Sequence, residues 1–388
     1  MMHRSAVLLA ASCVLLLAAC DKDKEVDPPA ELVEFKPSVR IDELWAAGLG
    51  GDMKNLRLGL RPSVEGDRIY AASHDGDVYA FDLKTGRVQW RARTELPLSG
   101  GPGLGGGRLF IGSSEGDVVA LSASDGKQLW HVTTSGEVLA PPAATETIVV
   151  VRTVDGRLRG LDPADGHELW VTEQQVPRLS LRGTSPPVIN GDMALCGFDN
   201  GRVVAVGLSD GDILWETTVA PSRGRTELER LVDIDSAVQV VGDDVFVVGF
   251  QGRAAMLALV SGQIWWSRDA SSDRGLAVGE EAIYVSAADG DVIALRRRDG
   301  TPIWTQSALH RRGLSAPAID GSAIVVADFE GYLHWLDAAT GAFLARTATD
   351  GHRITNAPLA VDGLVIVLTD SGKLNVFRRL ESPQPSSG

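Results

Sequence analysis

The sequence predicts an all-β fold, an eight-bladed β-propeller of four-stranded blades whose ring closes by pairing of the N- and C-terminal strands. Three observations support this prediction. A glycine-centred segment recurs eight times along the 388 residues, a tryptophan follows most copies at a fixed distance, and the last copy ends before its outermost strand. A single sheet of this kind cannot bury both of its faces, whereas sheets stacked radially around an axis can.

The repeat is clearest in its first copy, where Asp75–Asp82 is followed by Thr85, Gly86 and Trp90. Its first glycine returns at intervals of 40, 40, 45, 51, 38, 41 and 41 residues, at Gly76, Gly116, Gly156, Gly201, Gly252, Gly290, Gly331 and Gly372. Fourteen residues after each of the first six glycines stands a tryptophan, and Ala345 takes this place in the seventh copy: Trp90, Trp130, Trp170, Trp215, Trp266 and Trp304. We expect each tryptophan to wedge between neighbouring blades while its indole N–H donates to a carbonyl group.

Each copy divides into four short strands. In the seventh copy, residues 316–319, 323–327 and 332–336 are apolar or β-branched runs separated by glycine turns, and a last strand follows Gly341. Such runs are strand and hairpin signals, and no stretch has a helical period.

The two chain ends are predicted to share the eighth blade. After Gly372 the chain supplies residues 373–379 and then a polar tail, so this copy lacks its outermost strand. The stretch Val39–Trp45 has the character of that strand, and Trp45 matches the absent tryptophan. Pairing of the two ends hides strand edges that otherwise invite aggregation.

The chain begins with the features of a bacterial lipoprotein. An apolar run after Arg4 is too short to span a bilayer and is typical of the middle of a secretory signal. It ends at Leu17-Ala18-Ala19-Cys20, where small residues allow cleavage and the Cys20 thiol is the predicted lipid acceptor. We therefore predict a signal peptide at 1–19, a lipidated flexible tether at 20–38, the propeller at 39–380 and a polar tail at 381–388.

Charge and cysteine content narrow the function. With 51 acidic against 37 basic residues the formal net charge is −14, which argues against the basic surface that nucleic acid and anionic lipid head groups attract. Of three cysteines only Cys196 lies in the predicted propeller, which therefore holds no internal disulfide. Its apolar neighbours indicate a small buried side chain.

Two of the repeat intervals, 45 and 51 residues, are longer than the rest, and their extra residues fall between the outer strand of one blade and the inner strand of the next. Such loops share one face of a propeller, and insertions there often form a binding surface. The first insertion, residues 174–183, contains Leu179, Leu181 and Arg182, whereas the second, residues 223–235, is densely charged. Two interpretations stay open: the leucines anchor a partner, or they plug the loop onto the propeller while the charges are solvated.

From the lipid-attachment motif to the last blade, the sequence resembles the BamB family, the lipoprotein propeller subunits of the outer-membrane β-barrel assembly machinery. The resemblance is most specific in Leu179-Ser180-Leu181-Arg182-Gly183, in Thr226–Leu231 with the acids that follow, and in Glu330–Trp335. In that family, the first insertion and an acidic pair contact a periplasmic polypeptide-transport-associated domain of BamA, the barrel-forming subunit. The resemblance therefore implies five partner-binding residues: Leu179, Leu181, Arg182, Asp233 and Asp235. The leucines are then desolvated anchors, and the charges set the orientation of the partner.

Three features depart from the family pattern: Asp21, Ala345 and the charged turn Arg296–Arg298. The family is anchored by lipid to the periplasmic face of the cell outer membrane. By resemblance to enteric lipoproteins, Asp21 directly after the lipidated cysteine leaves the inner membrane open. The other two departures look local.

Catalysis has little support in the sequence. The seven histidines are scattered without the spacing of metal ligands, so no metal site is expected. The glycine-rich run 100–107 lacks the strand-then-helix setting of a phosphate loop and is predicted to be a flexible turn. The enzyme alternative is a pyrroloquinoline-quinone dehydrogenase, but the chain has neither the length of that family nor its adjacent cysteines, and no cofactor is expected.

The expected function is a non-catalytic scaffold that holds the periplasmic domains of BamA while the Cys20 lipid keeps the complex at the membrane, assisting folding and insertion of β-barrel proteins. Direct contact with nascent outer-membrane proteins, by pairing a client strand with an exposed blade edge, stays open. A propeller that binds some other envelope protein is the remaining alternative, because a fold does not fix a function.

Overall fold

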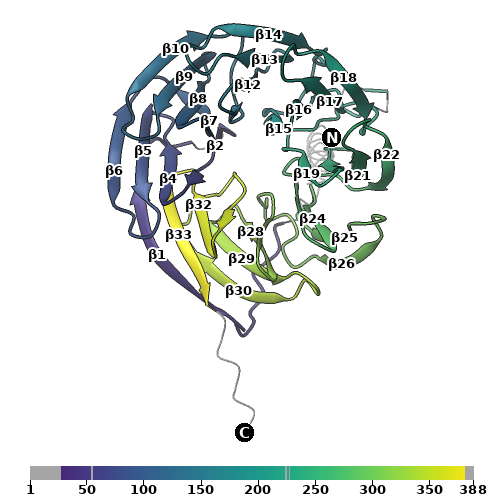
Figure 1. Cartoon of the computed structure of the whole chain (residues 1–388). Coiled ribbons are helices and arrows are strands. Elements are labelled where there is room, and N and C mark those ends of the chain that lie inside the picture. The colour runs from purple at the N-terminus through teal and green to yellow at the C-terminus, as the bar shows by residue number, and fades with distance from the viewer. Residues whose placement is uncertain (1–27, 54–55, 223–224, 227, 381–388) are drawn as a thin grey trace, which may run out of the picture.

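The computed structural model describes residues 28–53, 56–222, 225–226 and 228–380, and this part of the chain is all β, without a helix. Its sheets are arranged radially around a central axis (Figure 1). In chain order the strands are β1 (Arg40–Gly48), β2 (Gly59–Leu60), β3 (Ser63–Glu65), β4 (Arg68–Ala72), β5 (Asp77–Asp82), β6 (Val88–Arg93), β7 (Leu98–Gly105), β8 (Arg108–Ser113), β9 (Asp117–Ser122), β10 (Gln128–Thr133), β11 (Ala143–Ala144), β12 (Val149–Arg152), β13 (Arg157–Leu161), β14 (Glu168–Glu173), β15 (Val188–Asn190), β16 (Met193–Gly197), β17 (Arg202–Gly207), β18 (Ile213–Thr218), β19 (Gln239–Val241), β20 (Asp244–Val248), β21 (Arg253–Ala258), β22 (Ile264–Asp269), β23 (Leu276–Val278), β24 (Ala282–Ser286), β25 (Val292–Arg296), β26 (Pro302–Gln306), β27 (Ala318–Asp320), β28 (Ala323–Ala327), β29 (Tyr332–Asp337), β30 (Phe343–Ala348), β31 (Leu359–Val361), β32 (Leu364–Leu368) and β33 (Lys373–Leu380).

These strands form eight antiparallel blades, as predicted. Blade 1 is β3–β6, blade 2 is β7–β10, and blades 3 to 7 continue in steps of four strands to β30. Blade 8 is completed by both chain ends, in the order β31, β32, β33 and β1. The short strand β2 adds to the inner edge of blade 2 in parallel with β7. Seven of the sheets therefore have four strands and one has five.

The ring closes where the sequence predicts. β1 pairs antiparallel with β33 from Arg40 opposite Leu380 to Gly48 opposite Lys373. The indole of Trp45 on β1 then donates to the Leu83 carbonyl of blade 1 at 3.1 Å. The N-terminal strand thus supplies both the missing edge and the missing tryptophan of the eighth repeat.

The tryptophans close the seams between blades as predicted. Each donates its indole N–H to a backbone carbonyl of the following blade at 2.8–3.1 Å, the donors being Trp45, Trp90, Trp130, Trp170, Trp215, Trp266 and Trp304. The ring lies against the turn glycine of that blade so closely that a Cβ on Gly126 would stand 2.5 Å from the Trp90 ring. Such a contact admits only glycine, which explains why tryptophan and turn glycine recur together.

Blade 7 departs from this pattern for a structural reason. In blades 1, 2 and 4 the tryptophan lies opposite a small residue of the neighbouring strand, as Trp90 lies opposite Ala80. Blade 7 reverses the sizes, because Trp335 on β29 lies opposite Ala345 on β30. Fully buried, Trp335 donates to Asp320 Oδ2 at 3.0 Å. The large ring of blade 7 is therefore carried by the third strand of the blade instead of the outermost one.

The prediction of a flexible turn at residues 100–107 is wrong, because Leu98–Gly105 is the inner strand β7 of blade 2. Its glycines are needed where the backbone entering blade 3 crosses close by. A Cβ on Gly103 would lie 1.9 Å from the carbonyl oxygen of Pro142, and one on Gly100 would lie 2.4 Å from that of Ala140. Close approach of two backbones, rather than turn flexibility, accounts for the glycine-rich run.

The prediction of a flexible tether over residues 20–38 is wrong for residues 30–38. From Ala30 onward the chain is docked on the propeller, with the Ala30 amide donating to the His310 carbonyl and the Ser38 amide donating to the Leu344 carbonyl, both at 2.9 Å. The predicted signal peptide, Cys20, Asp21 and the tail 381–388 lie outside the described residues. Among the residues described, no helix has the length and apolar character needed to cross a membrane.

Candidate functional site

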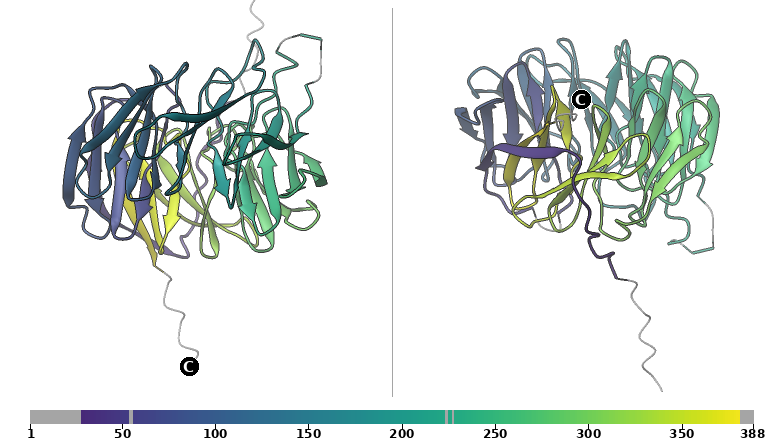
Figure 2. Two further views of the ribbon diagram at one scale, coloured as in Figure 1. Left: turned by 45° about the horizontal axis from the view of Figure 1, so that its top comes forward. Right: turned by 90° about the horizontal axis from the view of Figure 1, so that it is seen from below.

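Both predicted insertions lie on one face of the ring. They connect the outer strand of one blade to the inner strand of the next, β14 to β15 and β18 to β19. We call the side of these connections the loop face. Figure 2 shows the β18–β19 connection standing out on this side, while β33 ends on the opposite side. The insertions therefore add surface to a single face, as expected from the spacing of the repeats.

The first insertion is fixed by bonds on both of its sides. The Leu181 amide donates to Asp233 Oδ2 at 3.0 Å, which ties the first insertion to the second. Arg182 donates to the Leu56 carbonyl in the β1–β2 connection at 3.0 Å and pairs with Glu137 in the β10–β11 connection at 3.1 Å. The loop is therefore held in one conformation before any partner arrives.

The five predicted partner-binding residues come together, but they are not equally accessible. Leu179 is 44% exposed, Leu181 is half-buried and Arg182 is exposed. Asp233 is only 1% exposed, so its carboxyl group cannot meet a partner directly in this conformation. Its contact with the Leu181 amide makes it a support for the displayed loop.

Asp235 lines the centre of the ring next to the first insertion. One of its oxygens would lie 3.1 Å from a Cβ placed on Gly183, so the loop backbone passes directly over it. One buried oxygen of each carboxyl group, Oδ1 of Asp233 and Oδ1 of Asp235, has no hydrogen-bond partner. A buried carboxylate with an unpaired oxygen is costly, so this arrangement favours the protonated form.

Burial is the main cause of the raised pKa of both carboxyl groups. For Asp233 the nearby charge of Asp235 raises the pKa further, and for Asp235 the charge of Asp199 does so. The pair therefore holds a proton at pH values where an exposed aspartate has lost it.

Arg152 and Asp199 complete the support beneath the loop, and the sequence-based prediction missed both. They form a buried ion pair at 3.1 Å, with the guanidinium stacked 4.3 Å from the Phe198 ring. Burial raises the pKa of Asp199, while Arg152 and a hydrogen bond from Ser180 of the loop oppose the rise. The available signal was Arg152 itself, a charged residue at the end of the apolar strand β12, where β4 has Ala72.

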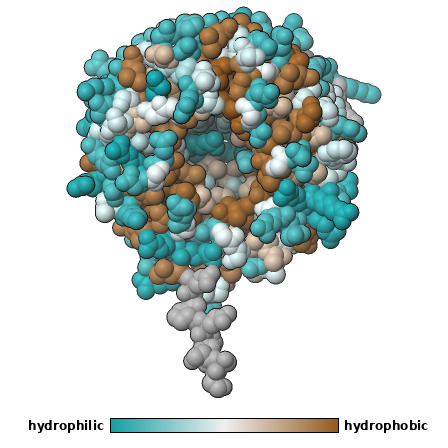
Figure 3. Space-filling view, viewed as in Figure 1, coloured by the Kyte–Doolittle hydropathy of each residue, from teal (hydrophilic) through white to brown (hydrophobic). Residues whose placement is uncertain are grey.

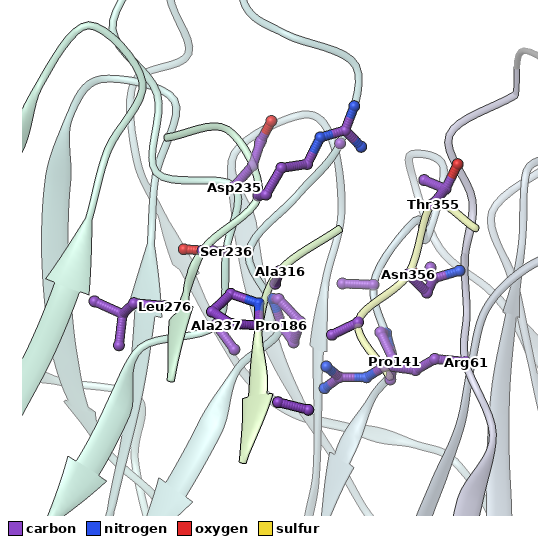
Figure 4. A pocket seen from close by; sticks show the side chains of 18 of the residues that line it. Arg61, Pro141, Pro186, Asp235, Ser236, Ala237, Leu276, Ala316, Thr355 and Asn356 are labelled. Carbon is purple, nitrogen blue, oxygen red and sulfur yellow. The ribbon is translucent and has the colours of Figure 1, made fainter. Parts of the chain in front are cut away.

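A central pocket of about 440 Å³ opens beside these residues. Figure 3 shows the hollow at the middle of the ring. In Figure 4, Asp235 and Ser236 lie on one side of the pocket, and Arg61 and Asn356 on the other. The pocket lining carries both charges, since Arg57 and Asp273 form an ion pair at 2.5 Å within it. This mixed lining is suited to water and polar groups rather than to an apolar ligand.

The histidines of the described residues lie where a structural role predicts, and most of them pair with an aspartate nearby. His131 contacts Asp117 at 2.8 Å, for example, and His334 contacts Asp328 at 3.0 Å. Two groups of acids with a histidine come within ligand distance of one another on the surface, which the spacing along the sequence did not predict: Asp162, Asp165 and His167, and Asp289, Asp291 and His310. Cys196 is buried as expected, and burial raises the pKa of its thiol to about 11.

The profile of the family described as outer membrane protein assembly factor BamB matches this sequence at residues 42–97, 74–306 and 289–382. The outer membrane protein assembly factor BamB of Pseudomonas aeruginosa is 50% identical over 377 residues, covering 96% of this chain and 98% of the relative.

Two solved structures separate family from fold. The crystal structure of BamB from Moraxella catarrhalis matches with a TM-score of 0.81 at 28% identity, over 87% of this chain and all 100% of the other. A quinohemoprotein alcohol dehydrogenase from Comamonas testosteroni matches with a TM-score of 0.66 at 13% identity, over 89% of this chain and 78% of the enzyme. At that identity, the likeness to the dehydrogenase shows a common fold alone.

Proposed function

This chain belongs to the BamB family of outer membrane protein assembly factors, and from this premise we propose that it is a non-catalytic scaffold that binds the periplasmic domains of BamA. In this role it assists the folding and insertion of β-barrel proteins. The proposal places the protein at the periplasmic face of the outer membrane, anchored by lipid on Cys20, with the inner membrane as the alternative that Asp21 raises.

The observation that carries the proposal is the rigid display of Leu179 beside Arg182. An apolar side chain that is 44% exposed at the tip of a loop gains free energy when a partner covers it. Because Asp233 already fixes the adjacent Leu181 amide, little loop entropy is lost on binding. An exposed arginine next to an apolar anchor adds the direction of approach through charge-assisted hydrogen bonds.

Asp233 and Asp235 have a different role in this proposal from the direct contact that the family resemblance implies. The carboxyl group of Asp233 accepts from the loop backbone, and Asp235 lies beneath the same loop at Gly183, in the lining of the central pocket. Their replacement therefore weakens binding by releasing the loop, whereas replacement of Leu179 weakens binding by removing the contact itself.

Binding of the mature chain, residues 20–388, to purified periplasmic domains of BamA tests the proposal. We expect Leu179→Ala to weaken the affinity about 30-fold, which corresponds to roughly 2 kcal/mol for an anchor residue. Leu129→Ala is the matched control, because Leu129 is a similarly exposed leucine, 48%, on the outer strand β10. Equal effects of the two variants, or no binding by the unaltered chain, would overturn the proposed partner face.

Two variants of one residue separate support from contact. Asp233→Asn keeps an oxygen that accepts from the Leu181 amide and should bind nearly as well as the unaltered chain. Asp233→Ala leaves that amide without its acceptor and should bind less well, mainly through slower association of a mobile loop. Equal binding by both variants would mean that the loop needs no support from this position.

The alternative of a quinone-dependent dehydrogenase rests on the common fold, and the family assignment favours the assembly factor. Absorbance of pyrroloquinoline quinone in protein purified from its native host would support the enzyme. Copurification of the barrel subunit BamA without such absorbance would support the scaffold.

A further inference from the structure

The described N-terminal segment forms a strap across the outside of blade 7. We define the strap as residues 30–38, which run from the His310 carbonyl on the loop face to the Leu344 carbonyl near the start of β1. Two of its apolar side chains face the propeller: Phe35 stacks on Phe343 with ring centroids 5.1 Å apart, and Leu32 packs against the core between blades 6 and 7.

Two arginines of the propeller hold the strap by its backbone. Arg312 donates to the Ala30 carbonyl at 3.0 Å, and Arg346 donates to the Val33 carbonyl at 3.0 Å. The Arg346 guanidinium also lies over the Phe35 ring, 5.1 Å from its centroid. The strap contacts the propeller through both its backbone carbonyls and its aromatic ring. It is therefore a bound segment rather than a free linker.

The arginines are positioned by a buried polar network. Arg312 donates to Asp328 at 2.8 Å and pairs with Glu330, while Arg346 donates to His334 Nδ1 at 3.1 Å. His334 in turn donates through Nε2 to Asp328 at 3.0 Å, which makes it a neutral imidazole. Burial is the main cause of its lowered pKa. The network therefore orients the guanidinium groups of Arg312 and Arg346 toward the strap, while Asp328 and His334 hydrogen-bond to each other inside the blade.

The fold itself does not require this network. At the position of Asp328, three residues before the repeat glycine, other blades have Ser73, Ser113 or Thr369. At the position of His334, three residues after that glycine, most have an apolar residue such as Val119 or Ala255, and the polar exceptions are Arg159 and Asn375. A charged side chain inside a blade is unfavourable unless paired, and blade 7 is the blade with an aspartate at this position, paired with His334 and Arg312 beneath the strap. We take this to indicate that the network serves the strap. The segment Glu330–Trp335, one of the three segments that carry the family resemblance, lies outside both insertions and belongs to this site.

We propose that this network is a docking site for the chain's own N-terminal segment and that it directs the membrane anchor out of the loop face. This inference rests on the proposed lipid at Cys20. The right-hand view of Figure 2 shows the purple segment before β1 leaving the ring on the same side as the β18–β19 connection. From Cys20 to Ala30 a chain of about 10 residues spans at most about 35 Å, whereas an undocked chain to Arg40 spans about twice that distance. Docking thus turns the partner-binding face toward the lipid surface. It also shortens the distance that the chain can span between the lipid and the propeller.

Hydrogen exchange of the mature chain tests the docking. We expect the amides of Ala30 and Ser38 to exchange at least about tenfold more slowly than in an unstructured peptide, because both are hydrogen-bonded. The double variant Arg312→Gln/Arg346→Gln should lose this protection in residues 30–38. Arg202→Gln, which breaks a surface pair with Glu216, is the matched control and should keep it. Free exchange in the unaltered chain, or full protection in the double variant, would overturn the docking site.

A second measurement tests the direction of exit without disturbing the network. Cys20 of the unlipidated mature chain accepts a spin label, whereas the buried Cys196 does not react. A second label is placed either at Asp289→Cys, on the loop face, or at Arg298→Cys, in the turn of blade 6 on the opposite face. Electron paramagnetic resonance then measures the distance from the Cys20 label to each of these two positions. We expect the distance to Asp289→Cys to be the shorter, and the reverse order would refute the exit face. Because no lipid is present, these results stand whether or not Cys20 is lipidated in the cell, which the mass of the membrane-bound chain decides separately.

Discussion

The seams between blades and the loop face are built by opposite means. Each tryptophan seam repeats one contact, an indole that fills a groove over a turn glycine and donates to a carbonyl, as Trp130 does to Pro163. The loop face instead uses side chains that occur once, such as the pair Asp233 and Asp235 and the buried ion pair of Arg152 with Asp199. The seams bury apolar area with the indole N–H groups hydrogen-bonded, whereas the loop face buries charge.

This difference separates the residues that stabilise the ring from the residues that shape a surface. Burial of aromatic area stabilises a fold directly. Burial of paired charges is close to neutral or unfavourable, so such groups are weak indicators of stability and stronger indicators of a specific conformation. We therefore expect substitutions in the seams to change the free energy of unfolding most and substitutions on the loop face to change binding most.

The largest expected effect comes from emptying one seam. Trp130 is 8% exposed, and its replacement by alanine removes a buried ring and leaves the Pro163 carbonyl without its donor. We expect Trp130→Ala to lower the free energy of unfolding by about 3–5 kcal/mol. Urea denaturation measures the loss, and the folded variant should bind the BamA domains with unchanged affinity. A loss below about 1 kcal/mol would show that the seams are not the main stabilising contacts.

A smaller effect is expected at the glycine side of the same kind of seam. Gly126 has φ +75 and would place a Cβ 2.5 Å from the Trp90 ring, whereas Gly107 has φ +70 with nothing within 4 Å. Gly107→Ala therefore measures the backbone strain alone, about 1 kcal/mol. We expect Gly126→Ala to lower the free energy of unfolding by about 1–3 kcal/mol more than that, because the seam has to open. Equal losses in the two variants would place the whole effect in the backbone.

On the loop face, the carboxyl pair should make stability depend on pH. The pKa values of Asp233 and Asp235 are raised in the folded chain, so the stability linked to their protons is complete at pH values below the ordinary carboxyl range and is lost as the pH rises through the raised values. We expect the free energy of unfolding to fall by about 1 kcal/mol or more between about pH 6 and pH 9.

Asp235→Asn removes one charge of this pair and should flatten the dependence. The exposed Asp243→Asn in the turn before β20 is the control and should leave the slope as it is. Urea midpoints across the pH range measure all three proteins. An unaltered chain whose stability is flat over this range would contradict the raised pKa values of the pair.

The sequence was sufficient to predict the repeated part of the molecule. The contact between a tryptophan and a turn glycine occurs in seam after seam, so the same residues recur at the same spacing. The glycine and tryptophan spacing predicted the blades, the seams and the closure of the ring by Trp45. It could not predict that the glycine-rich β7 is a strand, because the constraint comes from the backbone near Pro142, about 40 residues farther along the chain. The exchange of sizes between Trp335 and Ala345 was hidden for the same reason, since it is visible only across two paired strands.

The candidate site was predicted less completely, because its residues act through burial. Insertion lengths located the loop face, and Leu179 is exposed there as an anchor has to be. The burial of Asp233 depends on how two insertions from different blades fold against each other, which no local pattern encodes. The strap on Arg312 and Arg346 was missed because a charged, proline-containing segment is typical of a linker, and its docking partners lie about 300 residues away.

The smallest expected effect on stability distinguishes the two interpretations of the insertion leucines. If Leu179 displays an apolar surface, Leu179→Ala should change the free energy of unfolding by less than about 0.5 kcal/mol, as is usual for an exposed position. Leu181 is half-buried beside Asp233, so Leu181→Ala should cost about 1 kcal/mol by removing packing under the loop. Urea denaturation of both variants, beside their affinities for the BamA domains, assigns each leucine as a plug or an anchor. Should Leu179→Ala prove the more destabilising of the two, the exposed leucine holds the loop to the ring, and the contact with a partner has to be sought at Arg182.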